Sequence, residues 1–314
     1  MKGNMFLGYA RGSVGDVTFA RIKGQQTARA RNRQPANPRT SGQMTQRTMF
    51  MSAVKFYSRG VQNLFKFAFE GRKSAESDYN AFMRLNSSQG MYMKKADFDS
   101  KIYPAVGNWT LSQGSLSGIT QEEWDNVNNK AIFTIGSTSE TTAPTTVGAL
   151  AALLIQTGRW QINDIVTTLR ITSNGVAGSV SEPITGIIVA PQWDIRQFIV
   201  DTTDETALSN YGIAAEIASG VLRLTRALGT SSISGGAIIQ SRRTDNGLRV
   251  STSKLINNAQ ATTAIGYGNS PEWKSEVLAD WSAREPAILE GSEVAVTGGR
   301  SIALASHGLE DEDE

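Results

Sequence analysis

The stretch GGAIIQSRRTDNGLRVSTS, residues 235–253, decides the fold class of this chain. Two β-rich arms flank Asp245-Asn246-Gly247, a combination that favours a tight turn between antiparallel strands. Runs of similar character, separated by Gly, Ser and Thr, lie at residues 131–136, 165–171, 186–189, 198–201, 221–225 and 237–240. We therefore predict that residues 102–314 are β-rich and form a sandwich or barrel, of jelly-roll or Ig-like type. One predicted helix, over residues 147–157, interrupts the strands.

The first 40 residues are predicted to form a basic arm with a β-hairpin. Residues 14–22 and 25–31 have strand-like spacing, and Lys23-Gly24 between them marks a turn. A period of two places Arg29 and Arg31 on one face of the second strand. The following QPANPRT, residues 34–40, contains two prolines that stop the strand and hold the chain extended.

Residues 41–101 are predicted to form a helical hairpin. Thr40 or Ser41 can cap the first helix, and apolar residues recur at helical spacing from Met44 to Phe69. Gly71 is a plausible stop, and a second helix is expected over about residues 74–85. The aromatic rings of this segment either pack in its core or form an interface between subunits. The interface hypothesis names Phe50, Tyr57, Phe65, Phe67 and Phe69.

Charge is strongly segregated along the chain. Residues 1–101 carry 18 Lys and Arg against 6 Asp and Glu, whereas residues 102–314 carry 13 against 23. Between residues 21 and 47 there is no acidic residue and there are seven basic ones, namely Arg21, Lys23, Arg29, Arg31, Arg33, Arg39 and Arg47. Such a segment favours an acidic partner, and arginine suits bidentate contacts to phosphate. Three interpretations stay open: nucleic acid, the acidic half of another copy, or an arm coated only by solvent.

The sequence offers little material for catalysis. It has no cysteine and one histidine, His307, close to the acidic residues 310–314. Thiolate nucleophiles, cysteine metal sites and Ser-His-Asp triads therefore have no basis here, and no phosphate loop or HExxH motif is present. The carboxylates of Glu122-Glu123-Asp125 and of Asp201, Asp204 and Glu205 are interpreted as solvated acids in polar loops. We expect no enzyme, no cofactor and no bound metal.

Two further features limit the function classes. The N-terminus lacks the pattern of a secretory signal, and the most apolar window, residues 147–155, is too short to cross a bilayer. We expect a soluble protein with no membrane span. The six tryptophans are not interleaved with basic residues, so they are interpreted as core anchors or interface residues.

The N-terminal third contains a set of motifs that resembles a known family. The matching residues are Gly12-Ser-Val-Gly15-Asp-Val17, Arg21 with Lys23-Gly24-Gln25, Thr27-Ala-Arg29-Ala-Arg31, Asn37-Pro-Arg-Thr40, the Gln43/Gln46-Arg47 spacing, FEG at 69–71, and Asn80, Phe82 and Asn86. This pattern is similar to an uncharacterised protein family of Bacteroidota and gut-associated phages. The 235–253 hairpin matches more loosely. The resemblance implies a phage or mobile-element setting and a virion component, and it brings no catalytic residue.

The sequence thus predicts a self-assembling phage virion protein, part of a capsid, tail or connecting ring. Its partners would be other copies of itself, other virion proteins and genomic DNA, and it would be made in the bacterial cytoplasm. An arm that docks on an adjacent copy gives a heterologous contact, which closes into rings when the rotation permits. Two alternatives remain: a soluble phage nucleic-acid-binding protein, and a host-surface-binding β-sandwich module.

Overall fold

The computed structural model describes residues 12–22, 25–31, 39–62, 68–70, 72, 76–100, 102–173, 188–230, 232–245 and 247–284. Contacts within the chain define two compact units. The first comprises residues 1–44, 73–76 and 286–314, and the second comprises residues 45–72 and 77–285. The chain is mainly β, with an N-terminal sheet and several helices.

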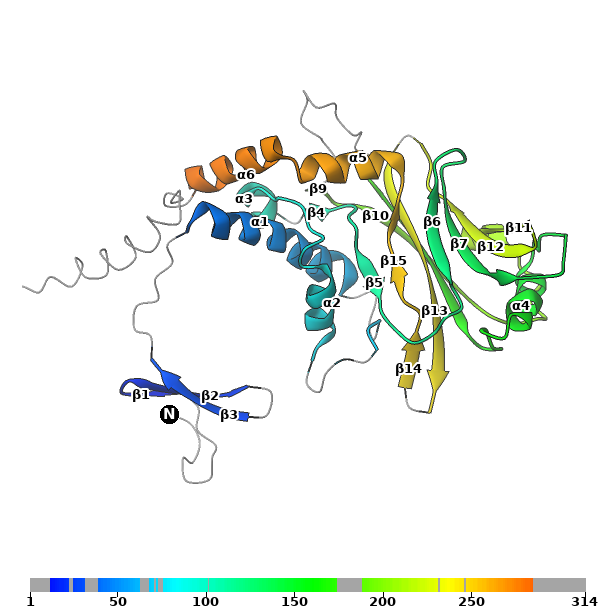
Figure 1. The fold of residues 1–314 in the computed structure, drawn as a ribbon, viewed down its shortest axis with the longest axis horizontal. Helices are drawn as coiled ribbons and strands as arrows, with labels where there is room; N and C mark the ends of the chain where they lie inside the picture. The colour runs from blue at the N-terminus through cyan, green and yellow to red at the C-terminus, as the bar shows by residue number, and fades with distance from the viewer. Residues whose placement is uncertain are drawn as a thin grey trace, which may run out of the picture. The chain divides into compact units, whose positions relative to one another are not determined.

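The first unit contains a three-stranded antiparallel sheet, β1 (Gly12–Val14), β2 (Val17–Ile22) and β3 (Gln25–Ala30), in that order (Figure 1). We call it the N-terminal sheet. The predicted hairpin is confirmed, because β2 pairs with β3 along its whole length. Gly15 turns the chain from β1 into β2 with a φ of +53°, a conformation that glycine adopts without strain. The predicted turn at Lys23-Gly24 lies outside the described residues.

The predicted helical segment is present but shorter than expected. Helix α1 (Ser41–Phe56) continues into one π-helical turn, η2 (Tyr57–Val61), and α2 (Asp78–Asn86) follows with the Ser77 side chain as its N-cap. The prediction that the first helix reaches Phe69 was wrong, since Phe69 forms a parallel bridge with Gln113. The π-helical turn includes Gly60, where a Cβ atom would lie 2.7 Å from the Trp193 ring. A glycine is needed there because the backbone passes directly against that ring.

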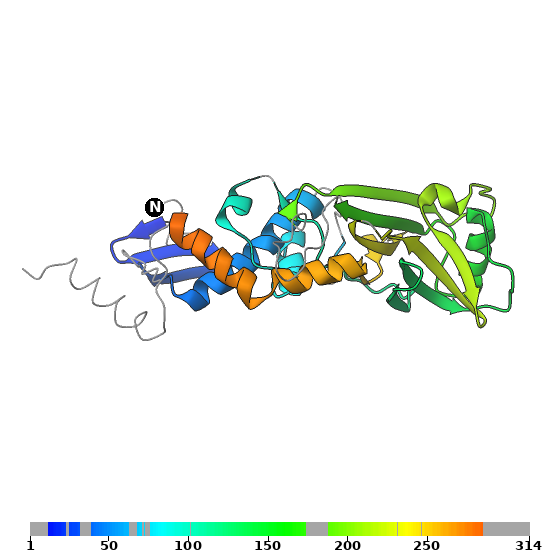
Figure 2. The ribbon, with the colours of Figure 1, turned by 90° about the horizontal axis from the view of Figure 1, so that it is seen from above.

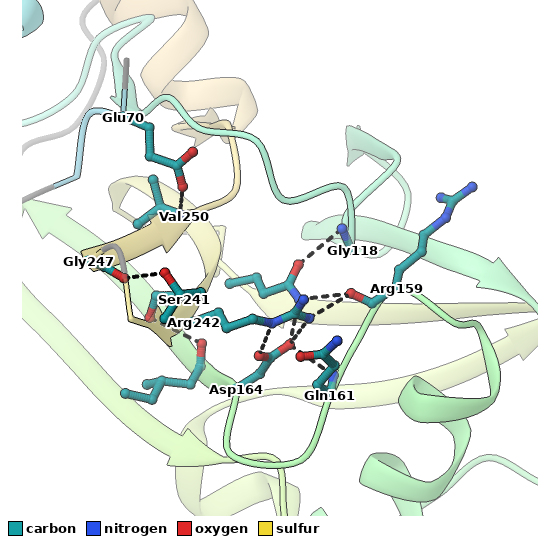
Figure 3. A network of polar contacts seen from close by, with 12 residues as sticks. Glu70, Gly118, Arg159, Gln161, Asp164, Ser241, Arg242, Gly247 and Val250 are labelled. Carbon is teal, nitrogen blue, oxygen red and sulfur yellow. Dashed lines mark hydrogen bonds and ion pairs between the residues drawn. The ribbon is translucent and has the colours of Figure 1, made fainter. Parts of the chain in front are cut away.

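Two polar side chains attach the helical segment to the strands. The Asn86 side chain is buried, donates to the carbonyls of Thr110 at 2.9 Å and Phe82 at 3.1 Å, and accepts from the Thr110 N–H at 2.7 Å. The Glu70 carboxylate accepts from the N–H groups of Ser115, at 2.9 Å, and of Val250 (Figure 3). Both residues belong to the motifs of the family resemblance, and here they join one segment of the fold to another.

Two antiparallel sheets form most of the second unit. One has the order β10 (Gln192–Ile199), β8 (Ile165–Ser173), β13 (Ile233–Thr244), β14 (Gly247–Val250), with β16 (Ile256–Asn257) also paired to β13. The other has the order β11 (Ala214–Ala218), β12 (Val221–Ala227), β7 (Lys130–Ser137), β6 (Gln121–Asp125). The hairpin predicted over residues 235–253 is confirmed by β13 and β14, which pair up to Thr244 opposite Gly247. Neither sheet closes into a barrel within the described ranges.

The remaining elements are α3 (Lys95–Asp99), β4 (Tyr103–Pro104), β5 (Thr110–Ser112), α4 (Val147–Gln156), β9 (Ile188–Val189), η3 (Leu208–Tyr211), β15 (Ser253–Lys254), α5 (Ala259–Gly268) and α6 (Pro271–Arg284). Helix α4 confirms the helix predicted over 147–157. The expectation of only one α-helix after residue 101 was wrong, because α5 and α6 also form. The Asn258 side chain caps α5 by accepting from the Ala261 N–H at 2.8 Å, and Pro271 is the first residue of α6, where its fixed φ is favourable.

The central strands of the five-stranded sheet, β8 and β13, are buried on both faces over most of their length. Along β13, Ala237 and Ile239 pack with residues of α1, α2 and α5, whereas Ile238 packs with Phe133 of the other sheet and with residues of α4. Successive side chains of a strand point to opposite faces, so β13 separates two hydrophobic cores. Figures 1 and 2 show α5 and α6 following one another on the helical side, with α4 at the far end of this unit.

A buried polar network lies where β13 passes the loop before β8. The Asp164 carboxylate is 1% exposed and accepts from the Arg242 guanidinium at 2.6 and 2.7 Å and from the Gln240 amide at 2.8 Å (Figure 3). Gln240 in turn accepts from the Gly118 N–H at 3.0 Å. Hydrogen bonding to Asp164 raises the pKa of Arg242, which therefore stays charged.

We expect Arg242→Met to lower the free energy of unfolding by about 3–5 kcal/mol, because it leaves the buried Asp164 charge without its counter-ion. The matched control is Arg243→Met on the next residue of β13, which is exposed and should change stability by less than about 0.5 kcal/mol. Urea unfolding of both variants measures the difference. Equal effects would contradict the assignment of Asp164 and Arg242 as the central pair of this network.

Candidate functional site

The described arginines of the N-terminal sheet are divided between its two faces. In the register of the N-terminal sheet, Arg29 lies opposite Thr18 and Arg21 lies opposite Gln26, so the two arginines are on opposite faces. Arg29 and Arg31 are exposed, and the Arg31 N–H donates to the Asp16 carbonyl at 2.6 Å.

Two more of the predicted basic residues lie at α1. Arg39 precedes α1 with a φ of 50° and is half-buried, while Arg47 is exposed on α1. Lys23 and Arg33 are outside the described residues.

The N-terminal sheet has an apolar face and a polar face. Val14, Val17 and Phe19 share the face of Arg21, and Val14 and Val17 are 47% and 38% exposed. The other face carries Arg29 beside the hydroxyl groups of Ser13 and Thr18, which are 3.0 Å apart. Every described side chain of the sheet is exposed or half-buried. The sheet therefore has no hydrophobic core of its own.

The aromatic residues predicted to form an interface differ in how far they are buried. Tyr57 and Phe69 lie inside the second unit at 8% and 2% exposure, and the Tyr57 ring packs 5.1 Å from that of Phe82. Phe50 is 42% exposed on α1, and Phe65 and Phe67 lie outside the described residues. Of the described members, only Phe50 is accessible for contact with another molecule.

The two groups of acidic residues differ from each other in the structure. Asp201 and Asp204 lie in a turn, and their carboxylates accept hydrogen bonds from N–H groups of that turn. Hydrogen bonds from Thr203 lower the pKa of Asp201. The interpretation of Glu122 and Glu123 as solvated loop acids was wrong. Both are half-buried on the edge strand β6, because residues 254–257 pass beside that strand.

An open pocket, which we call the edge groove, lies beside β6. It has a volume of about 450 Å³. Its walls come from β6, from β15 and β16, and from segments near α2 and α5, and its lining residues are Gln89, Asn108, Thr110, Glu122, Glu123, Trp124, Lys254, Leu255, Ile256, Asn257 and Thr262. Two carboxylates, one ammonium group, three carboxamides and an indole thus line one surface.

The sequence alone does not reveal the edge groove. Its lining combines two runs that are each continuous in sequence, residues 122–124 and 254–257, with single residues from other segments. Two acidic residues beside a tryptophan were the one local signal available.

Glu122 connects β6 to β15. Its carboxylate accepts from the Ser253 hydroxyl at 2.8 Å and from the Lys254 N–H at 2.9 Å. Burial raises the pKa of Glu122 above its ordinary value of 4.5, and the contacts with Ser253 and Lys254 oppose that rise. Adjacent residues of a strand point to opposite faces, so Glu122 and Glu123 border the edge groove from different sides of β6 and are not the facing pair of carboxyl groups that glycosidases use.

Asn257 holds the floor of the edge groove together. Its Nδ2 donates to the Gly107 carbonyl at 3.1 Å and lies 3.4 Å from Asn108 Oδ1. Because both neighbours are acceptors, they fix the orientation of the amide. Its Oδ1 is enclosed by protein and accepts no hydrogen bond from the described part of the chain, which costs about 1–3 kcal/mol.

Neither a metal-ligating cluster nor a membrane-spanning helix is found among the described residues. Within the described ranges, no group of three or more His, Asp or Glu side chains is placed to hold a metal ion. In the same part of the chain, no helix has both the length and the apolar character needed to cross a bilayer.

Residues 9–161 match a family of unknown function, DUF6266. The matched region is slightly less than half of the chain, and it includes the N-terminal sheet, the attachment residues Glu70 and Asn86, and strand β6 of the edge groove. Neither curated proteins nor solved structures gave a match to the chain.

We expect Glu122→Gln to remove a pH-dependent contribution to stability while keeping both hydrogen bonds, because a carboxamide accepts from the Lys254 N–H and donates to the Ser253 hydroxyl. A carboxyl group whose pKa is raised by folding contributes stability fully below its unfolded pKa and loses it as the pH rises through the folded pKa. Wild-type protein should therefore be less stable, relative to the variant, at about pH 7 than at about pH 4.

Urea unfolding at the two pH values measures this difference, with Glu140→Gln at an exposed position as the matched control. A wild-type-to-variant difference that stays constant with pH would show that burial of Glu122 has no energetic effect.

Proposed function

We propose that this chain is a structural protein that assembles with copies of itself, and that the N-terminal sheet is the element each copy extends to a neighbour. The family resemblance supports placing it in a phage virion, as part of a capsid, tail or connecting ring. Under this proposal the two antiparallel sheets of the second unit act as a β-sandwich that builds the shell or ring. The protein would act by binding and not by catalysis.

The observation that carries the proposal is a regularly paired sheet in which no described side chain is buried. Three strands become stable when a hydrophobic face is covered by other structure. In the N-terminal sheet, the face of Val14, Val17 and Phe19 is only partly covered. Apolar surface removed from water contributes roughly 25 cal/mol per Å², so a partner that covers this face would stabilise both the sheet and the contact.

Charge favours a second copy as that partner. The N-terminal sheet exposes Arg29 and Arg31, whereas residues 102–314 carry ten more acidic than basic residues. A basic sheet at one end of the chain and an acidic C-terminal half at the other favour a head-to-tail contact between copies. Such heterologous contacts produce rings or shells when the rotation closes.

We expect Arg29→Glu/Arg31→Glu to abolish assembly of the full-length protein, because it places like charges at the proposed contact. The matched control is Arg59→Glu/Arg243→Glu, which reverses two exposed arginines of the second unit. Mass photometry across a salt series should show oligomers for wild-type and control and monomers for the first variant. Circular dichroism checks that all three chains are folded.

The same samples with single- and double-stranded DNA separate the proposal from the nucleic-acid alternative. If wild-type protein stays monomeric and binds DNA with an affinity that falls steeply with salt, and the N-terminal variant loses that binding, self-assembly is rejected in favour of a genome-binding role. If wild-type and both variants stay monomeric and none binds DNA, both roles fail and a surface-binding module remains.

A further inference from the structure

The edge groove has acceptor capacity that its own lining does not use. Each Glu122 oxygen accepts one bond, and Glu123 Oε2 accepts one from the Gln121 side chain at 3.2 Å. A carboxylate oxygen can accept two hydrogen bonds, so both side chains keep unused acceptor sites. A ligand that brings several donors and no acceptors complements this surface.

The guanidinium group of arginine has that character. It presents five N–H donors in a plane, carries a permanent positive charge and stacks well on an aromatic ring. The edge groove supplies the indole of Trp124, and its two carboxylates exceed the single ammonium group of Lys254 by one negative charge. A saccharide would leave that charge unused, because its hydroxyl groups are neutral and need donors as well as acceptors.

We propose that the edge groove binds an arginine side chain from the N-terminal sheet of a second copy, Arg29 or Arg31. This inference rests on the proposed self-assembly and identifies the receiving surface. The two arginines lie on one face and are separated by roughly 7 Å along an extended strand. When one enters the edge groove, the other is close enough to reach the neighbouring carboxylate at the rim. Each copy therefore carries both halves of the contact.

The test uses two full-length variants, each lacking one half of the contact. Arg29→Glu/Arg31→Glu removes the arginines and keeps the edge groove. Glu123→Lys reverses a charge in the edge groove and keeps the arginines. Glu123 is chosen because its only described side-chain bond is to a residue of the same strand, so its replacement leaves the connection from Glu122 to β15 intact. Glu140→Lys, at an exposed position, is the matched control.

We expect each contact variant alone to be monomeric by mass photometry, and the control to assemble like wild-type. An equimolar mixture of the two contact variants should regain oligomers, because an intact sheet meets an intact edge groove and the reversed sheet meets the reversed edge groove with opposite charge. If Glu123→Lys assembles like wild-type while Arg29→Glu/Arg31→Glu does not, the receiving surface is elsewhere and self-assembly stands. If wild-type itself is monomeric, the proposed function fails first.

A direct binding measurement does not depend on oligomers. A synthetic peptide of residues 25–31 is titrated into the Arg29→Glu/Arg31→Glu variant and followed by tryptophan fluorescence and calorimetry. Adding Glu123→Lys to that chain should weaken binding by at least about tenfold, because it places a like charge beside the guanidinium. Adding Lys254→Gln should instead strengthen it by about twofold to fivefold, because a competing cation is removed. Equal affinities in all three chains overturn the proposal, and so does binding of neutral oligosaccharides with no response to the peptide.

Discussion

Burial of both faces of the five-stranded sheet is the constraint on which the rest of the second unit depends. Ile238 and its neighbours Ala237 and Ile239 belong to different cores, so each face of β13 needs its own covering layer. One layer is the four-stranded sheet with α4, and the other is the helical segment with α5. Neither core exists without β13. At a free-energy gain of about 25 cal/mol per Å² of apolar surface, these two interfaces are the main source of stability.

Hydrogen bonds decide how those layers are positioned. Asn86 and Glu70 form hydrogen bonds with backbone N–H and carbonyl groups that would otherwise lack a partner. These bonds fix the helical segment against β5 and β14. Asp164 and Arg242 do the same where the loop before β8 meets β13. Hydrophobic contacts alone tolerate sliding, whereas buried polar groups tolerate only the arrangement in which every partner is present. These residues therefore select one packing among several that would bury similar area.

The N-terminal sheet follows a different rule. Its strands pair in a regular register, yet no described side chain in it is buried. The second unit, in contrast, has an edge groove in which two carboxylates meet a single ammonium group. A sheet without a described core and a groove with surplus negative charge are both suited to contact with another molecule. Contact between copies would complete both, and this connects the charge segregation of the sequence to a specific pair of surfaces.

The sequence by itself determined the features that depend on neighbouring residues. The hairpin around Asp245 and Gly247, the N-terminal hairpin, the helix at α4 and the charge asymmetry all follow from local turn chemistry, periodicity and counting. Tertiary structure decided the end of the first helix, where the chain turns against Trp193. It also decided the presence of α5 and α6, because the helix-start residues Asn258 and Pro271 are weak sequence signals next to a long run of predicted strands. It alone decided the edge groove, since burial of Glu122 depends on residues 253 and 254, which lie more than a hundred positions away. Periodicity reports which residues share a face of one element, but only packing brings the faces of distant elements together.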